Sequence, residues 1–289
     1  MIDVLTLNYN DSKTVIEFVN SIVRFPSVRK IIIVDNCSTD DSLKRLENIQ
    51  SDKVDVVKSD KNGGYGAGNN LGIKYLCEKY ESEYILLANP DVVISENTIN
   101  ELEKFIKNKP EYSVVAPMMT DADGVIQYNS AFKIPRLISY LISFELFLSR
   151  KIKPFCYKGI EKTNRSFCEV DSVAGSLFMM NAKDMLRFGL FDENVFLYSE
   201  ELVLGIKFKN AGLKMALLAN KSYVHNHSVS ISKTYRSACK RNMLMNKSKL
   251  YVLKEYYHVN KVVLVFAYLL TCINLLESFV FDLFRKMKG

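Results

Sequence analysis

The sequence lacks the patterns that mark a zinc protein or a disulfide framework. Its six cysteines are scattered along 289 residues, with no CxxC pair and no neighbouring histidine cluster. Zinc sites and small disulfide scaffolds depend on such spacings. The chain also shows no basic region and no cleavage site after Met1, so we predict no signal peptide. Together these absences favour reduced thiols in a cytosolic setting.

The common nucleotide-binding fingerprints are also missing, although residues 63–68 read GGYGAG. A dinucleotide fingerprint needs a sixth-position glycine, but counting from Gly64 that position is Asn69, and no Gly-Lys-Ser/Thr of a P-loop occurs. We interpret the glycines as a helix start that lies close to a bound group such as a diphosphate. A purely structural tight turn is the alternative.

Long apolar runs are scarce, and none reaches the roughly 20 residues that span a bilayer. Residues 262–276 form an apolar stretch that follows a basic region between Lys233 and Lys261. We predict that this segment lies in a membrane interface, attracted to anionic lipid by its basic flank. Packing on the protein's own core or on a partner is the alternative. For the apolar residues 137–148, also flanked by basic residues, a core helix is favoured over membrane contact.

The overall composition is that of an ordinary globular protein. Hydrophobic residues make up 48% of the chain and charged residues 25%, which argues against disordered and fibrous classes. The net charge is +7. Because this positive charge is not interleaved with the aromatic residues that single strands stack on, we predict no nucleic acid partner.

Two periods alternate along the first half of the chain. Short apolar runs rich in β-branched residues predict buried strands at residues 2–7, 31–34, 54–57, 84–88 and 114–116. Segments of helical period between them predict helices at residues 12–24, 40–49, 67–80 and 95–108, the last with Ser95 at its start. This alternation predicts an α/β fold with a mostly parallel central sheet flanked by helices.

The second half is less regular. It predicts strands at residues 170–181 and 214–218, helices at 182–187 and 199–210, and a further segment at 223–230. With no internal repeat, we predict one catalytic domain over residues 1–233 and a helical, basic and apolar extension over 234–289.

Polar residues follow several of the predicted strands. In parallel sheets, ligands bind beyond the carboxyl ends of the strands, so these residues should gather at one edge. They are Asn8, Asn10, Asp35, Asp60, Asn62, Asn89 and Asp91. Carboxylates there are the hard ligands that Mg²⁺ or Mn²⁺ prefers, and Pro90 fixes the backbone that aims Asp91. Read alone, Asn-Pro-Asp is also a common turn.

Two further groups could take part in catalysis. Glu200 and Glu201 stand at a predicted helix N-terminus, about 100° apart in direction, so at most one can point into a shared site as a general base. Favourable charge against the helix dipole is the alternative. His225 and His227 face one side of a predicted strand and could complete a metal shell or contact phosphate, although histidine pairs are more often packed or surface features.

Several of these motifs occur in one order and together resemble family 2 glycosyltransferases with the GT-A fold, in a bacterial polysaccharide or rhamnosyltransferase-like branch. The match covers roughly residues 1–230. The motifs are residues 34–40 (VDNCSTD), 62–70 (NGGYGAGNN), 89–91 (NPD), 174–176 (AGS), 189–193 (GLFDE), Glu200-Glu201, and His225 followed by Ser228 and Ser230.

The resemblance implies that residues 1–117 form a nucleotide-binding half and residues 118–233 an acceptor-binding half of the catalytic domain. It also implies roles for particular residues. Asp35 would bind the nucleotide base or ribose, and the same pocket would include Asn8, Asn10, Asp60, Asn62, Gly64, Asn69 and Asn89. Asp91 and His225 would bind the metal, Mg²⁺ or Mn²⁺. Ala174, Gly175 and Ser176 would form the acceptor-side loop. Glu201 would be the base, with Glu200 as the alternative.

The implied activity is inverting transfer of a sugar from a nucleoside diphosphate sugar, UDP- or dTDP-linked, to a hydroxyl. The basic, apolar C-terminus suggests a lipid-linked glycan acceptor and peripheral binding at the cytoplasmic face of the membrane, with a homodimer as a further possibility. Where the family pattern has a second acid and an arginine, this chain has Val203 and Lys207. Two alternatives therefore stay open: a catalytically impaired nucleotide-binding scaffold, or a sugar nucleotidyltransferase.

Overall fold

Strands and helices alternate in the first half of the chain, as predicted. The structure is a computed structural model that describes residues 1–226 and 237–287. The elements of this half are β1 (Ile2–Asn8), α1 (Ser12–Ile22), β2 (Val28–Asp35), α2 (Ser42–Glu47), β3 (Val54–Lys58), α3 (Gly64–Tyr80), β4 (Tyr84–Ala88), β5 (Val92–Val93), α4 (Glu96–Asn108) and β6 (Tyr112–Thr120). Ser95 caps α4 as expected, because its hydroxyl accepts the Thr98 N–H at 3.2 Å.

The second half departs more from the predicted elements. It contains β7 (Ala131–Phe132), α5 (Leu137–Ile142), α6 (Leu146–Ile152), β8 (Phe167–Val170), β9 (Ser172–Val173), β10 (Leu177–Asn181), α7 (Ala182–Asp184), α8 (Glu200–Asn210) and β11 (Lys214–His225). The strand predicted at residues 170–181 is wrong, because the chain changes partners there and forms parts of three strands. The strand predicted at 214–218 instead continues to His225 as β11.

One sheet organises these elements. Its strand order is β3-β2-β1-β4-β10-β6-β11-β5, with β8 also paired to β11. The pairs β1–β2, β1–β4, β2–β3 and β6–β11 are parallel, whereas β10 runs antiparallel to both β4 and β6. Because β10 lies between strands of the first half, residues near 177–181 are brought into the middle of the sheet.

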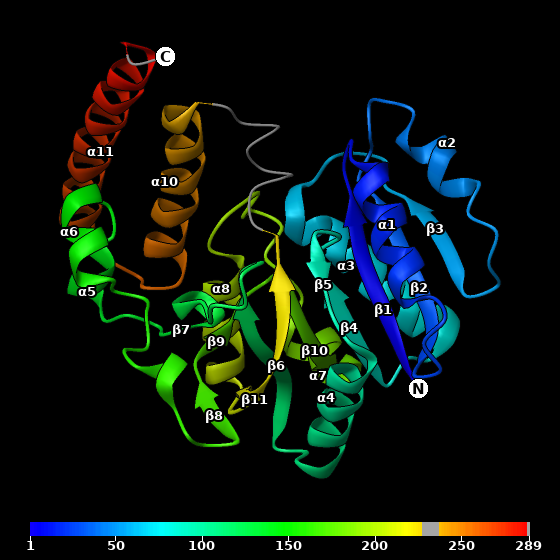
Figure 1. The fold of residues 1–289 in the computed structure, drawn as a ribbon. Coiled ribbons are helices and arrows are strands. Elements are labelled where there is room, and N and C mark those ends of the chain that lie inside the picture. Colours follow the sequence, from blue (N-terminus) through cyan, green and yellow to red (C-terminus); the bar gives the residue numbers. More distant parts are fainter. Residues whose placement is uncertain (227–236, 288–289) are drawn as a thin grey trace.

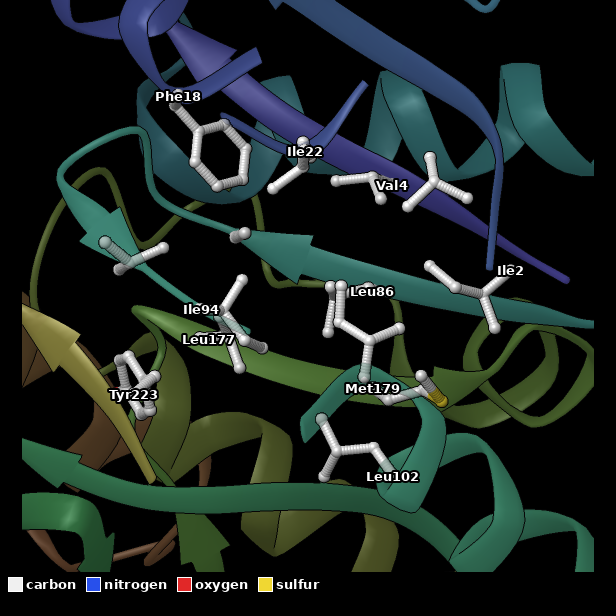
Figure 2. Packing of buried hydrophobic residues seen from close by; sticks show 14 of the residues in the cluster. Ile2, Val4, Phe18, Ile22, Leu86, Ile94, Leu102, Leu177, Met179 and Tyr223 are labelled. Atoms are coloured by element: carbon white, nitrogen blue, oxygen red, sulfur yellow. The ribbon is translucent and has the colours of Figure 1, made fainter. Parts of the chain in front are cut away.

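Helices cover both faces of this sheet, and the strands bury both sides. In β4, Leu86 belongs to the same buried cluster as Phe18 of α1 and Leu102 of α4 (Figure 2). Its neighbours Ile85 and Leu87 point the other way, into a cluster with Ile73 of α3 and Phe208 of α8. Burial on both faces explains the continuous apolar runs that marked these strands in the sequence.

A third buried cluster joins the C-terminal helices to the catalytic part. It contains Tyr140 of α5, Val203 of α8, Val252 of α10 (Ala238–Glu255) and Ala267 of α11 (Lys261–Met287). Figure 1 shows α10 and α11 side by side at one edge of the molecule, with α5 and α6 next to α11. The boundary predicted at residues 233 and 234 lies outside the described residues.

The apolar run near the C-terminus is longer than predicted. Glu277 does not end it, and α11 is one helix of 27 residues. Its segment Lys261–Val280 has 20 residues and a mean hydropathy of 2.0, so by length and composition it could cross a membrane. The prediction of a segment too short to span is therefore wrong on length.

Candidate functional site

Asn8 and Asp35 lie side by side at the carboxyl ends of β1 and β2, where the parallel register pairs them. Both are almost fully buried. Asn8 Nδ2 donates to Asp35 Oδ1 at 2.7 Å, and the Ser38 hydroxyl donates to the same oxygen at 2.6 Å. The Ser38 N–H donates to Asp35 Oδ2 at 3.0 Å. These donors fix the carboxylate in one orientation.

The loops that follow β1 and β3 continue this edge. Asn10 has a left-handed backbone, with φ +54°. Its side chain donates to Thr39 Oγ1 at 3.0 Å and accepts the Thr39 N–H at 2.8 Å. Asn62 Oδ1 accepts the Gly64 N–H at 3.1 Å, which fixes the start of α3. Asp60 is exposed on the same loop. The predicted nucleotide-binding residues thus come from neighbouring loops at one edge of the sheet.

The glycine-rich stretch approaches the protein's own backbone at the start of α3. Gly64 has φ +88°, and a Cβ there would lie 2.2 Å from the carbonyl oxygen of Phe196. The Tyr65 N–H donates to that oxygen at 3.1 Å. Asn69 is buried, and its Nδ2 donates to the Tyr65 carbonyl at 3.0 Å within the helix. The requirement for glycine at position 64 therefore has a structural cause.

Asp91 and His225 face each other because β5 and β11 pair with Val92 opposite His225. His225 Nε2 lies 3.3 Å from Asp91 Oδ1, and the two side chains are only 12% and 10% exposed. Asp91 Oδ1 is buried and makes no hydrogen bond of good geometry within residues 1–226 and 237–287. His225 Nδ1 lies 3.3 Å from Met119 Sδ.

This pair fits a divalent cation. A buried carboxylate oxygen without a hydrogen bond costs free energy unless a ligand satisfies it, and carboxylate oxygen and imidazole nitrogen both suit Mn²⁺. In the part of the chain that the structure describes, no group of three or more His, Cys, Asp or Glu side chains could hold a metal. Phosphate oxygens and water would therefore supply the remaining ligands. His227 lies outside the described residues.

The loop between β9 and β10 connects the Asn-Pro-Asp segment to two tyrosines. The Asn89 N–H donates to the Ser176 carbonyl at 2.8 Å. The Ser176 hydroxyl shares a hydrogen bond with the Tyr223 hydroxyl at 2.6 Å. The Tyr65 hydroxyl donates to the Gly175 carbonyl at 2.6 Å. The predicted acceptor-side loop is therefore held directly against the predicted metal-binding segment.

Glu200 and Glu201 begin α8 in different surroundings. A Cβ on Gly175 would lie 2.7 Å from Glu201 Oε1, so this carboxylate lies against the acceptor-side loop. Burial raises the pKa of Glu201, although the backbone N–H groups of Glu201 and Gly175 partly stabilise its charge. Glu200 is 5% exposed. Burial, and then the charge of Glu201, raise the pKa of Glu200 well above its usual range.

The 174–176 loop contacts both ends of the candidate site. The Asn89 N–H donates to the Ser176 carbonyl at 2.8 Å, and the Glu201 carboxylate lies against Gly175. The Tyr223 hydroxyl is hydrogen-bonded to Ser176 of the same loop. Burial raises the pKa of the Tyr223 phenol, and the charges of Asp91 and Glu201 raise it further.

Sequence reasoning missed Tyr65, Tyr223 and Asn70. Asn70 Oδ1 accepts the Phe191 N–H at 2.8 Å, and its Nδ2 donates to the Phe191 carbonyl at 2.9 Å, which ties α3 to the segment that leads to α8. A signal existed for Tyr223, because it precedes His225 by two positions on one strand and so shares its face. Tyr65 lay within the glycine-rich stretch.

The two residues that depart from the family pattern, Val203 and Lys207, both contact other parts of the protein. Val203 is 1% exposed and packs in the third buried cluster. Lys207 Nζ donates to the Leu190 carbonyl, and burial lowers the pKa of this amine. Both residues thus support α8 and the segment before it.

The sequence model of a known family matches more than half of this chain. The matching family is described as glycosyl transferase family 2, and it covers residues 3–165. The chain belongs to this family. The glycosyltransferase is also 24% identical over 259 residues to the rhamnosyltransferase WbbL of Escherichia coli, which covers 75% of this chain and 95% of WbbL.

Another relative shows the same likeness. It is 26% identical over 213 residues, which is 69% of this glycosyltransferase and 67% of the relative. This relative is the N-acetylglucosaminyl-diphospho-decaprenol L-rhamnosyltransferase of Mycobacterium tuberculosis. The chain is thus similar to enzymes of glycan biosynthesis, and to rhamnosyltransferases among them.

Solved structures agree on the fold. The mannosyltransferase PcManGT of Pyrobaculum calidifontis, solved with GDP-Man and Mn²⁺, superposes with a TM-score of 0.57 at 13% identity, covering 90% of this glycosyltransferase and 65% of that chain. GalNAc-T7, solved with UDP, GalNAc and Mn²⁺, gives a TM-score of 0.58 at 14% identity over 80% of this chain and 44% of its own. The predicted GT-A fold is confirmed.

Proposed function

We propose that this glycosyltransferase transfers a sugar, with inversion, from a UDP- or dTDP-sugar to a hydroxyl group of a lipid-linked glycan. One observation carries the proposal: the 174–176 loop contacts both the Asn-Pro-Asp segment, through the Asn89 N–H, and Glu201, through Gly175. A diphosphate leaving group and an acceptor hydroxyl need such groups on opposite sides of the transferred sugar.

Donor binding is assigned to the polar edge of the sheet. The fixed carboxylate of Asp35 would accept hydrogen bonds from the base or ribose. The residues that would line the same pocket are Asn8, Asn10, Asp60, Asn62, Gly64, Asn69 and Asn89. The solved relatives that contain GDP-Man or UDP support a nucleotide ligand for this fold.

Asp91 and His225 are assigned as ligands of Mg²⁺ or Mn²⁺. When bound, the ion would neutralise the negative charge that grows on the departing diphosphate. The support is the buried, unsatisfied Asp91 Oδ1 facing an imidazole nitrogen at 3.3 Å. Asn89 would position this segment through its N–H bond to Ser176.

Glu201 is assigned as the general base, and Glu200 is the alternative. A base works best when its pKa lies near the working pH, and burial raises the pKa of Glu201 toward that range. Its contact with Gly175 places it at the acceptor-side loop. Glu201 would remove the proton from the acceptor hydroxyl as that oxygen attacks the sugar carbon from the face opposite the diphosphate.

The relatives and the C-terminal helices support the proposed lipid-linked acceptor and the proposed location at the membrane. The mycobacterial relative is named for a diphospho-decaprenol acceptor, and the exposed apolar face of α11 would suit a membrane-borne substrate. We therefore place the enzyme peripherally on the cytoplasmic face of the cell membrane, acting in cell-surface polysaccharide synthesis.

The test combines donor binding with transfer. A panel of UDP- and dTDP-sugars is screened by thermal shift with Mn²⁺, because a ligand of the folded state raises its stability. The donor found is then used with polyprenyl-diphosphate-linked N-acetylglucosamine as acceptor. Glu201→Gln should keep the donor-induced shift and lose transfer by about 10²- to 10⁴-fold. Asp91→Asn should lose the Mn²⁺-dependent part of the shift.

Exposed Glu78 of α3 supplies the matched control, because Glu78→Gln should leave both measurements unchanged. Loss of transfer in Glu200→Gln but not in Glu201→Gln would reassign the base. Donor binding without transfer to any acceptor of a broad panel would favour the impaired scaffold. Pyrophosphate release from a nucleoside triphosphate and a sugar phosphate would favour the nucleotidyltransferase.

A further inference from the structure

The polarity of α11 is the reverse of that expected for a helix on the surface of a water-soluble protein. Its buried positions include Ala267, Asn274 and Ser278, which are small or polar. Its exposed positions carry large apolar side chains, including Val262, Val265, Phe266, Leu269, Leu276 and Phe279, which are 51% to 77% exposed. Within the part of the chain that the structure describes, these large apolar side chains of α11 stay largely uncovered, while smaller and polar residues face the protein.

The buried side of α11 packs through Ala267, Leu264 and Leu270 on the third buried cluster and also makes two side-chain hydrogen bonds to α10. Asn246 Nδ2 donates to Asn274 Oδ1 at 2.9 Å, and Asn242 Nδ2 donates to Ser278 Oγ at 2.6 Å. Small and hydrogen-bonding residues between helices are typical where the outer surface meets hydrocarbon rather than water. The exposed residues lie on the side of α11 away from this contact. Val265 is nine positions before Asn274, which places it about half a turn around the helix from Asn274, and Cys272 follows Val265 by seven positions on the same face.

Basic residues accompany this apolar face. Lys240, Lys247 and Lys254 are exposed and recur every seven positions, so they lie on one face of α10. On α6, which lies beside α11 (Figure 1), Phe147 is 72% exposed and is followed by exposed Arg150. A hydrophobic face bordered by lysine and arginine is complementary to an anionic lipid surface.

The packing of α11 decides how it can meet a bilayer. Ala267, within the apolar segment, belongs to the same buried cluster as Val203 of the catalytic helix α8. Asn274 is hydrogen-bonded to Asn246, whose sequence neighbour is the exposed Lys247. If α11 crossed the hydrocarbon, both the catalytic part and a lysine would be carried into it, which is costly. The helix is therefore held along the protein rather than away from it.

We propose that α11 lies in the plane of the membrane, with its exposed apolar side sunk into an anionic lipid surface and the lysines of α10 at the level of the headgroups. The exposed side chains of α6 extend the same face. The catalytic sheet then stays in water on the other side of α10. This proposal does not depend on the donor, the metal or the base assigned above.

Vesicle flotation tests the surface. Full-length protein is mixed with vesicles of phosphatidylcholine, with and without phosphatidylglycerol. Wild type should float with the anionic vesicles, and Leu269→Glu/Leu276→Glu should reduce the bound fraction at least tenfold. The control Val125→Glu/Ile126→Glu changes two exposed apolar residues of the catalytic domain and should bind as wild type. Thermal melting of each variant checks that it is folded.

Tryptophan fluorescence tests the orientation, because the natural chain contains no tryptophan. Val265→Trp, Cys272→Trp and Phe279→Trp each place one probe on the exposed side, at steps of about 10 Å along the helix. Quenching by lipids brominated at different depths should give the same shallow depth for all three. Depths that differ steadily along the helix would show a spanning segment and overturn the proposal. A stable dimer without vesicle binding would also overturn it, because a second copy would then cover α11.

Discussion

At the scale of single residues, Gly64 is the position with the least freedom to change. Its φ of +88° disfavours any side chain, and a Cβ would lie 2.2 Å from the Phe196 carbonyl oxygen. Gly124 has a similar φ of +78°, but nothing lies within 4 Å of a Cβ there. Comparing an alanine substitution at each glycine therefore separates the free-energy cost of the left-handed backbone from the cost of a steric clash.

We predict that Gly64→Ala lowers the free energy of unfolding by about 3 kcal/mol or more, because backbone strain and overpacking add. Gly124→Ala should cost only about 1 kcal/mol, from the left-handed backbone alone. Urea unfolding followed by circular dichroism measures both. Equal losses in the two variants would show that the contact with Phe196 relaxes freely.

The same scale shows which site residues the sequence could reveal. Asp35, Asp91 and Glu201 stood out because each carboxylate follows a strand or opens a helix, where an acid has a recognisable use. Tyr65 and Tyr223 did not stand out, because a tyrosine beside glycines or on a strand has no single recognisable use in the sequence. Their hydrogen bonds to Gly175 and Ser176 depend on β10 entering the sheet beside β4.

At the scale of elements, Lys249 controls how α10 packs on α5. Its side chain is buried, and Nζ donates to the Ser143 carbonyl at 2.6 Å. Burial lowers the pKa of Lys249 to about 8. The unfolded chain has an ordinary lysine pKa of about 10.4. Between these values the unfolded state binds more protons, so this residue makes stability rise with pH.

We predict that Lys249→Met raises the free energy of unfolding at pH 7 by about 1 to 3 kcal/mol, because a buried charge is replaced by an apolar side chain of similar length. The gain over wild type should shrink as pH rises from about 8 to 10, where Lys249 becomes neutral in the folded protein. Urea unfolding across that range measures it. The exposed neighbour gives the control, Lys247→Met, which should change stability by less than about 0.5 kcal/mol at every pH. A gain that does not depend on pH would contradict the assignment.

The predicted elements succeeded or failed for identifiable reasons. The βαβ half was predictable because each strand is a short apolar run and each helix has its own start signal, as Ser95 shows for α4. The strand prediction for residues 170–181 was wrong because apolar residues stand at both ends of this stretch, whereas Gly175 and its neighbours turn the chain between two sheets. Pattern alone does not say which strand a segment will pair with.

At the scale of the whole molecule, α10 is attached to the segment that leads to Glu200 and Glu201, the proposed bases. Tyr251 and Tyr256 donate to Asp192 Oδ2 at 2.8 and 2.7 Å, and the Ser248 hydroxyl donates to the Leu197 carbonyl at 2.8 Å. Burial alone would raise the pKa of Asp192, but hydrogen bonds from Tyr256 and other donors bring it below its usual range. The C-terminal helices thus help to position α8.

We predict that Tyr251→Phe/Tyr256→Phe lowers kcat for sugar transfer by about tenfold and changes the donor KM by less than about twofold, because the base is displaced while the nucleotide pocket is intact. Steady-state kinetics over a range of donor concentrations measures both constants. Tyr268→Phe, which removes an exposed hydroxyl of α11, is the control and should leave kcat unchanged. A rise in KM with unchanged kcat would place the role of α10 in donor binding instead.

The sequence by itself determined the α/β class, the parallel strands of the first half, and the polar strand ends that carry Asp35 and Asp91, because local periodicity and turn chemistry report these directly. Only the tertiary structure decided that β10 enters the sheet and brings the 174–176 loop beside Asn89, that Tyr65 and Tyr223 hold this loop, and that α11 turns large apolar side chains outward. These features depend on pairings between segments far apart in the chain, for which local sequence carries no signal.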